Sequence, residues 1–445
     1  MIISTPQTDH RLREQLATLT QDDADYWSFR TKARREQGHG LFQYPAMMVP
    51  QMARAVLQQA CVVHPEIESV GDPFAGSGTI LTESMAKGLS FHGADINPLA
   101  ILLCRVKAGP FFVEALNEIV AEVIARIEGD LRNVIEVDFA NRDKWFRDDV
   151  QIQLSKIRRA ILREDSRWAR RFLWIGLAET VRLTSNSRTS TFKLHIRPAN
   201  EINTRNQDPI SIFKKVLLRN VEHMKDQAES LKNEGYLNRG HYRMNVQVVL
   251  GDTRRIEQRN LNDVIVTSPP YGDNTSTVPY GQYSYLPLQW IELADIDPAA
   301  NVDYLRSTLE IDARSLGGSK RIEKTDLEAL ADRSPALKRY IRKLKDQPPD
   351  RAKRVIAFFR DLDSCLDPIL ASLNAGGLIV WTLGNRKVGG KRVPLDTIVS
   401  ELLEVHHATL LCKLKRKISS KRMAFKNNIA ETMSSESILV MRKAA

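Results

Sequence analysis

The segment TSPPY, residues 267–271, gathers groups that could act on the amine of a planar ring. It follows the apolar run DVIV, and its prolines cannot continue a strand because proline donates no backbone hydrogen bond. An aromatic amine is a poor nucleophile, but the Ser268 hydroxyl and the Pro269 carbonyl could accept its protons as the nitrogen becomes tetrahedral. Tyr271 could stack on a base flipped out of a helix. The structural alternative is a rigid turn that Pro269 and Pro270 hold extended.

A glycine-rich segment, DPFAGSGT from Asp72 to Thr79, could bring a ligand close to the backbone. Its small residues Ala75, Gly76 and Gly78 fall where a strand should turn into a helix. No lysine follows the last glycine, so the segment is not a phosphate-clamping loop. A glycine turn alone is weak evidence, since purely structural turns use glycine too.

Two aspartates extend this pattern. Asp95 should end the next strand, about 20 residues further on, where a carboxylate could accept both ribose hydroxyls of a nucleoside. Asp252 should end a later strand, in VVLGD, where it could accept from an adenine amino group. Each aspartate alone is more often a helix cap. Because open α/β sheets bind ligands at the carboxyl ends of their strands, three acidic residues at such ends predict a nucleoside site.

The elements that must position these residues form a strand–helix–strand–helix series, which predicts a parallel sheet with right-handed crossovers. Residues 109–240 have a mainly helical pattern, and the sheet resumes after them. We therefore predict an α/β, Rossmann-like mixed sheet, mostly parallel with an antiparallel last strand, and a helical insertion. The expected segments are a helix at 45–62, strands beginning near 69, 91, 245, 263 and 377, and a closing antiparallel pair at 408–418 and 435–443.

Composition sets broad limits. The 445 residues, 42% hydrophobic and 27% charged, are typical of a soluble globular protein with two or three domains or with large insertions. No apolar run approaches the ~20 residues of a membrane helix, and the N-terminus lacks the pattern of a secretory signal. The four cysteines form no CxxC pair, which argues against a zinc site or a disulfide framework. A reducing prokaryotic cytoplasm is the simplest setting, and no residue is assigned to a metal.

The positive charge is concentrated in two regions of the chain. The net charge is +11 and the pI about 9.4. Residues 151–243 hold 19 Lys and Arg against 9 Asp and Glu, and residues 413–443 hold 9 against 2. A nucleic-acid partner would explain this distribution, and solubility alone is the alternative.

Taken together, these segments resemble the amino-directed S-adenosylmethionine-dependent DNA methyltransferases of the cytosine-N4 and adenine-N6 type. The resemblance rests on DPFAGSGT, GADINP, GDTRR and TSPPYGDN, with FQYPAMMVPQMARAVL upstream and the last strands downstream, and covers roughly residues 40–105 and 245–443. It implies S-adenosylmethionine as cofactor and double-stranded DNA with a flipped base as substrate. A cognate restriction system is a further partner of this kind of enzyme.

The resemblance also assigns residues. It places Ser268, Pro269, Pro270 and Tyr271 in the catalytic loop. It assigns to the cofactor Phe42, Tyr44, Pro45, Asp72, Pro73, Phe74, Ala75, Gly76, Gly78, Thr79, Asp95, Ile96, Asp252 and Thr253. Asn274 and Tyr280 could shape the base pocket or order the loop that follows.

A serine at position 268 resembles the cytosine-N4 enzymes, because the adenine-N6 enzymes usually carry Asp or Asn there. An adenine-N6 DNA methyltransferase is the alternative. An RNA methyltransferase that acts on an exocyclic amine is a weaker one, since only about 40 residues precede the cofactor segment. A non-catalytic nucleic-acid binder is disfavoured by the intact acidic positions and the intact SPPY.

The order of the segments gives three regions. Residues 1–108 form an N-terminal arm and the cofactor-binding half. Residues 109–240 form the basic helical insertion, our first choice for DNA recognition, with 185–198 as a basic ribbon or a solvated hairpin. Residues 241–445 form the catalytic half, with a charged insertion at about 300–350 as second choice. Basic side chains near the end of the chain could contact phosphates, namely Arg416, Lys417, Lys421 and Arg422.

Overall fold

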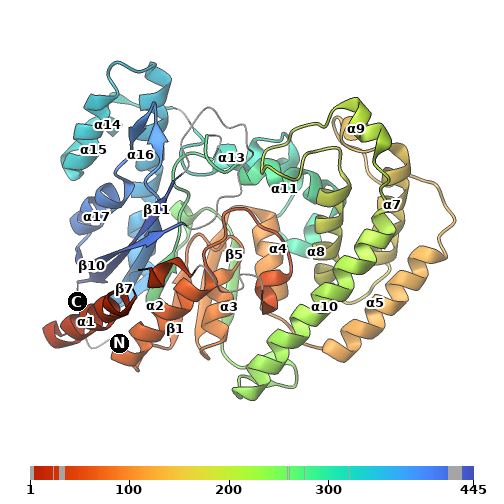
Figure 1. The fold of residues 1–445 in the computed structure, drawn as a ribbon, viewed down its shortest axis with the longest axis horizontal. Helices are drawn as coiled ribbons and strands as arrows, with labels where there is room; N and C mark the ends of the chain where they lie inside the picture. Colours follow the sequence, from red (N-terminus) through yellow and green to blue (C-terminus); the bar gives the residue numbers. More distant parts are fainter. Residues whose placement is uncertain are drawn as a thin grey trace.

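The computed structural model describes residues 5–23, 25–29, 36–257, 259, 261–274, 276–319, 321–418 and 433–444. A seven-stranded sheet lies at its centre, in the order β10-β11-β7-β6-β1-β2-β5 (Figure 1). Five strands are parallel, and β11 pairs antiparallel with both β7 and β10. The strands are β1 Ser69–Asp72, β2 Ser90–Asp95, β5 Val246–Leu250, β6 Asn262–Thr267, β7 Leu373–Leu383, β10 Ala408–Lys417 and β11 Ser435–Lys443. The predicted α/β sheet with an antiparallel last strand is confirmed.

The central strands β6 and β7 are buried on both faces, which explains why their middle parts are continuously apolar. In β6, Val264 and Val266 belong to one hydrophobic core, whereas Ile265 between them belongs to the other. β7 alternates in the same way, with Val380 in the first core and Trp381 in the second. This period of two is the geometry of a strand whose successive side chains point to opposite faces.

The N-terminal region begins with α1 and supplies helices to the first core. The elements are α1 Pro6–Asp22, η1 Tyr26–Ser28, η2 Gln37–Gly40, α2 Pro50–Val63, α3 Thr79–Met85 and α4 Pro98–Lys107. The predicted helix at 45–62 starts later than expected, at Pro50. Val49 is extended, at φ −75° and ψ 116°, because the ring of a following proline disfavours the helical conformation. Residues 45–49 are therefore free to form part of a cavity wall.

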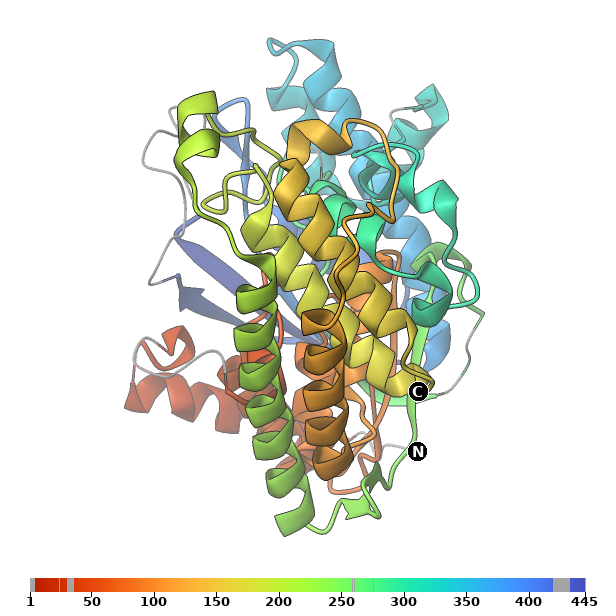
Figure 2. The same ribbon diagram turned by 90° about the vertical axis from the view of Figure 1, so that its right-hand side faces the viewer.

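The insertion is helical, as expected, and packs on the β5 side of the sheet (Figures 1 and 2). Its helices are α5 Val113–Glu128, α6 Arg142–Trp145, α7 Asp148–Leu162, α8 Arg167–Thr184, α9 Ala199–Thr204 and α10 Pro209–Asn233. A short ribbon of β3 Leu237–Asn238 and β4 His241–Tyr242 follows, so the predicted boundary at 240 falls at its turn. Between α8 and α9, an isolated antiparallel bridge joins Ser187 to Ile196.

Of the remaining elements, only the later ones lie toward the β10 edge of the sheet (Figure 1), and all of them follow β5 in the chain. They are η3 Thr253–Arg255, α11 Tyr280–Trp290, α12 Leu293–Ile296, η4 Val302–Leu305, α13 Glu310–Arg314, α14 Lys324–Arg333, α15 Pro335–Lys343, α16 Pro349–Ser372, β8 Lys387–Val388, β9 Lys391–Arg392 and α17 Leu395–Val405. None of the helices in the described part of the chain combines the length and apolar character that crossing a bilayer requires.

Candidate active site

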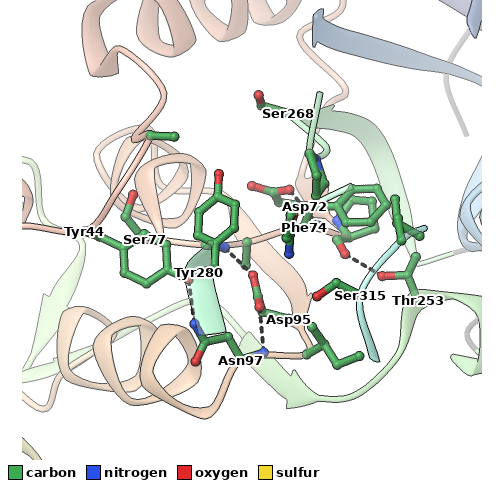
Figure 3. Close-up of a pocket in the computed structure, with 18 of the residues that line it drawn as sticks. Tyr44, Asp72, Phe74, Ser77, Asp95, Asn97, Thr253, Ser268, Tyr280 and Ser315 are labelled. Carbon is green, nitrogen blue, oxygen red and sulfur yellow. Dashed lines mark hydrogen bonds between the residues drawn. The ribbon is translucent and has the colours of Figure 1, made fainter. Parts of the chain in front are cut away.

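A cavity of about 900 Å³, counting space open to solvent, lies at the carboxyl ends of β1, β2, β5 and β6. We call it the main cavity. Its position follows from the strand order: the chain moves outward from β1 to β2 and β5, then returns to the other side of β1 with β6. A crevice forms where the order reverses in this way, and open α/β sheets bind ligands there. Figure 3 shows residues from these strand ends around the cavity.

Asp95 lies at one side of the main cavity and is held by backbone donors (Figure 3). Its two carboxylate oxygens accept from the Gly76 and Asn97 amides, each at 2.8 Å. Burial raises the pKa of Asp95 to about 6, although these backbone hydrogen bonds oppose the rise. The side-chain nitrogen of Asn97, Nδ2, donates to the Tyr44 hydroxyl at 3.0 Å and to the Ser284 hydroxyl at 2.7 Å. This network ties the end of β2 to the segment before α2 and to α11.

Asp72 ends β1 and is almost fully buried, at 3% exposure. It accepts from the Thr267 hydroxyl at 2.7 Å and from the Phe74 amide at 3.1 Å. Burial raises the pKa of Asp72 to about 7. Because Thr267 is the last residue of β6, this hydrogen bond fixes the start of the SPPY loop against the glycine-rich turn.

The glycine-rich turn needs its glycines for different reasons. Gly76 has φ +48° and Gly78 has φ +68°, a region that side chains with a Cβ rarely adopt. A Cβ at Gly78 would also meet the Cys104 sulfur at 2.9 Å, whereas one at Gly76 would meet no protein atom closer than 3.7 Å. Behind the turn, the buried Lys107 ammonium donates to the Ser77 carbonyl at 2.6 Å, and burial lowers the pKa of Lys107 to about 8. The turn is therefore supported from inside the protein.

Asp252 follows β5 and is clasped by Arg254, whose guanidinium donates to both carboxylate oxygens at 2.6–3.0 Å. The Thr253 hydroxyl donates to the Pro73 carbonyl at 2.6 Å (Figure 3). Arg254 also donates to the Arg314 carbonyl at 3.0 Å. The charge of Asp252 is thus compensated within the protein, a feature that the sequence reasoning did not include.

A second cavity, of about 760 Å³ counted in the same way, adjoins the main one. The residues predicted to form the catalytic loop, Ser268, Pro269, Pro270 and Tyr271, all line it. The two cavities share a wall made of Ala46, Met47, Met48, Ser268, Pro270 and Tyr280. The segment before Pro50 and the SPPY loop therefore lie between the two cavities, and Ser268 lines both.

Most of the predicted cofactor residues meet in the main cavity. It is lined by Tyr44, Pro45, Asp72, Pro73, Phe74, Ala75, Gly76, Thr79, Asp95, Ile96, Asp252 and Thr253. Phe42 and Gly78 do not line it. Phe42 is 3% exposed and packs edge-on against Tyr283, with ring centroids 6.1 Å apart, and Gly78 is the residue before α3.

Sequence reasoning missed several residues that line the main cavity. Asn97 lies within GADINP, and its place two residues after Asp95 was a usable signal. The segment around α13 gave no such signal, because only the tertiary fold brings it to the cavity. The missed lining residues are Ala46, Met47, Met48, Ser77, Ile80, Asn97, Gly251, Arg254, Ile311, Arg314, Ser315 and Leu316. Part of the charged insertion thus belongs to the cavity rather than to a separate unit.

The expectation that Arg416 contacts phosphate is wrong. Arg416 is 6% exposed, forms an ion pair with Glu436 and donates to the Trp27 carbonyl at 3.1 Å. Lys417 is exposed and lies 3.1 Å from Asp25. Lys421 and Arg422 lie outside the described residues.

Comparison with known proteins decides the family. Over 453 aligned residues the chain is 32% identical to the type II methyltransferase M.MvaI of Kocuria varians. The alignment covers 98% of this chain and 97% of that protein. The chain belongs to the type II methyltransferases. This methyltransferase is also 28% identical, over 108 residues, to the type II methyltransferase M.MjaII of Methanocaldococcus jannaschii. That shorter alignment covers 24% of this chain and 20% of the other protein.

Two other comparisons add little to the assignment of this type II methyltransferase. No protein-family model matches it. The structure of the rRNA methyltransferase aviRa from Streptomyces viridochromogenes aligns with 89% of this chain and 86% of its own at 11% identity, but the TM-score of 0.33 is too low to carry an argument.

The methyltransferase family uses S-adenosylmethionine, and the main cavity fits this cofactor. The polar lining consists largely of acceptors, which suits ribose hydroxyls, an ammonium group and an adenine amine. Asn274 supports the fit: it is 3% exposed, lines the main cavity, and its side-chain oxygen has no hydrogen-bond partner among the described residues. A buried acceptor without a partner is costly, and a bound donor would satisfy it.

Proposed function

We propose that this methyltransferase transfers a methyl group from S-adenosylmethionine to the N4 amine of a cytosine flipped out of duplex DNA. The observation that carries the proposal is the wall shared by the two cavities. A cofactor in the main cavity and a base in the second cavity would meet at Ser268 and Pro270. A flipped base must leave the stack before its amine can be reached, and the second cavity is lined by Ser268, Pro269 and Tyr271.

The chain's own residues would bind and orient the substrates and accept hydrogen bonds from the target amine. When bound, S-adenosylmethionine supplies the methyl group. Asp95 would accept from the ribose hydroxyls, and Asp252, already compensated by Arg254, has remaining lone pairs for the adenine amine. The Ser268 hydroxyl and the Pro269 carbonyl would accept from the amine of the base, which favours the geometry of a nucleophilic nitrogen. The Tyr271 ring would hold the base by stacking.

The choice of cytosine rests on Ser268. A neutral hydroxyl is a weaker acceptor than the carboxylate or amide usual in adenine-N6 enzymes, and the cytosine amine is more acidic than the adenine amine. A weaker acceptor therefore suits cytosine.

Mass spectrometry of nucleosides would test this choice, after incubation of the enzyme with cofactor and either duplex DNA or tRNA. We expect N4-methylcytosine from DNA. N6-methyladenine from DNA would show that the target base is adenine and not cytosine. Methylation of tRNA alone would show that the substrate is RNA and not DNA.

We place DNA recognition on the insertion, in the segment 185–198. The bridge between Ser187 and Ile196 closes it into a hairpin, and the Leu194 amide donates to the Gln282 side chain of α11 at 3.3 Å. The Phe192 ring packs edge-on against Tyr283 of α11, with centroids 5.8 Å apart. Because α11 starts at Tyr280, in the wall between the cavities, the hairpin is anchored beside the proposed base site. A cognate restriction enzyme would share the recognition sequence.

A further inference from the structure

A row of hydrogen bonds runs from the catalytic loop to the closing strands. The Ser268 hydroxyl lies 3.2 Å from the Tyr271 hydroxyl, which donates to Glu436 Oε1 at 2.9 Å. The other oxygen of Glu436, Oε2, forms an ion pair with Arg416. Arg416 and Glu436 face each other across β10 and β11, so the register of the antiparallel pair sets this contact. All four residues line the second cavity.

The chemistry of these groups fixes the direction of the row. An ionised carboxylate only accepts, and the Arg416 guanidinium only donates. The single proton of the Tyr271 hydroxyl is therefore committed to Glu436. Burial first, and then the Glu436 carboxylate, raise the pKa of Tyr271 well above its ordinary value, so the phenol keeps that proton. Its oxygen can then only accept from Ser268.

We infer that Glu436 is a positioning residue that makes Ser268 a pure acceptor toward the target amine. Held by Arg416, it draws the Tyr271 proton, and Tyr271 in turn draws the Ser268 proton away from the base. Both lone pairs of the Ser268 oxygen are then available to accept from the target amine. This inference rests on the proposed role of Ser268, but it holds for either a cytosine or an adenine amine.

Glu436→Gln tests the inference with little change in shape. The one amide oxygen of glutamine should turn to the stronger donor, Arg416, which leaves its NH₂ group facing Tyr271. The Tyr271 proton would then turn to Ser268, and the Ser268 proton would point at the base. We expect kcat to fall about tenfold to a hundredfold, as for a lost hydrogen bond to a charged group. The cofactor Kd and the KM for DNA should change less than about threefold.

A double-mutant cycle separates positioning from a structural role. Tyr271→Phe keeps the ring but removes the hydroxyl, so Glu436 should have nothing to act through. In a Tyr271→Phe background, Glu436→Gln should lower kcat by less than about threefold. Tyr340→Phe is the matched control, because the Tyr340 hydroxyl donates at 3.1 Å to the Lys391 carbonyl outside both cavities. It should leave kcat unchanged.

Two outcomes would overturn the inference: an unchanged kcat in Glu436→Gln, or the same loss in both backgrounds. The identity of the methylated nucleoside from the unmodified enzyme is a separate readout. N6-methyladenine would contradict the proposed base while the cycle still decides the role of Glu436. The kcat of the wild-type enzyme towards DNA is measured first. If the wild-type enzyme does not methylate DNA, the proposed function fails, and this result is distinct from failure of the inference about Glu436.

Discussion

At the residue scale, the charge of Asp95 should control cofactor binding. Its pKa is raised to about 6 by burial, so the carboxylate is ionised above that pH and becomes a neutral acid as the pH falls through it. A neutral acid accepts fewer hydroxyl donors, so we expect the Kd for S-adenosylmethionine to rise between pH 7 and pH 5, by at most about tenfold per pH unit. Calorimetry across this range, in buffers of different ionisation enthalpy, measures both the affinity and the proton exchanged.

Asp95→Asn should bind the cofactor weakly at every pH and lose the dependence centred near pH 6. Asp72, whose pKa is about 7, titrates close by. Asp72→Asn is therefore the matched control, and it should keep the Asp95 dependence. If Asp72→Asn removes the pH dependence of cofactor binding and Asp95→Asn keeps it, the titrating group is Asp72 and not Asp95.

Gly384 explains the position of the Tyr271 ring. A Cβ at Gly384 would lie 2.5 Å from that ring and 2.6 Å from the Met433 sulfur, so the ring rests directly on the backbone. We expect Gly384→Ala to push the ring away and break its hydrogen bonds to Ser268 and Glu436, at a cost of about 1–3 kcal/mol from overpacking. Single-turnover methylation should slow by at least about tenfold while cofactor affinity stays within about twofold. A normal rate would show that the ring position is not critical. Gly129→Ala is the control, because its φ is −78° and an added Cβ would meet no atom closer than 3.5 Å.

At the element scale, Asp295 anchors the insertion to the catalytic half. Its carboxylate lies at the end of α12 and accepts from Arg170 at 2.6 and 2.8 Å and from the Trp174 indole at 2.8 Å, both on α8. The side chain is buried, at 4% exposure. Asp295→Ala would leave the buried Trp174 indole without its acceptor and the half-buried Arg170 with only the Glu164 and Asp165 carbonyls, so we expect the unfolding free energy to fall by about 1–3 kcal/mol. Urea unfolding, followed through tryptophan fluorescence, measures this.

The pH dependence of this anchor has a defined sign. Burial alone would raise the pKa of Asp295, but Arg170 and Trp174 outweigh it and hold the pKa below its ordinary value. The stabilisation is therefore present above the unfolded pKa of about 3.9 and is lost as the pH falls below it. Asp303→Ala is the control, because its pair with Arg306 is half exposed and should contribute less than about 1 kcal/mol. Equal losses in the two variants would contradict the anchor.

The elements were predictable to the extent that their signals are local. The apolar runs and glycine turns predicted the strands, and the carboxyl ends of parallel strands then had to bring Asp72, Asp95 and Asp252 together. The approach of α13 to the main cavity depends on long-range packing, such as the Gly281 amide donating to Asp312 at 2.8 Å. The pairing of Arg416 with Glu436 depends on the register of two strands. Neither leaves a pattern in the sequence near the residues concerned.

At the scale of the whole molecule, the basic surplus of the insertion is smaller than the sequence count indicates. Arg158, Arg159, Arg170 and Lys214 form ion pairs with acidic residues outside 151–243. Arg158 and Arg170 pair with Glu292 and Asp295 outside the insertion, whereas Arg159 and Lys214 pair with acidic residues of the insertion itself. These four positive charges are therefore already compensated within the protein. Arg188 of the hairpin differs, because it is exposed. Figure 1 places α9, which follows the hairpin, on the same upper side of the molecule as α11 and α13.

Arg188→Ala should therefore weaken DNA binding through a lost phosphate or base contact. If Arg188 contacts a phosphate, the slope of log Kd against log salt should fall by about 0.9, equally for specific and non-specific DNA. If it contacts a base edge, the salt slope should hold and discrimination at one position should relax by about 1–3 kcal/mol. Arg239→Ala is the control, since Arg239 is exposed but lies in the β3–β4 turn, beyond the far end of α10 from α9. Salt-dependent fluorescence anisotropy with a labelled duplex distinguishes these results. Equal binding by wild type and Arg188→Ala, or equal losses in Arg188→Ala and Arg239→Ala, would place recognition elsewhere, with the segment around α13 next, because it already borders the main cavity.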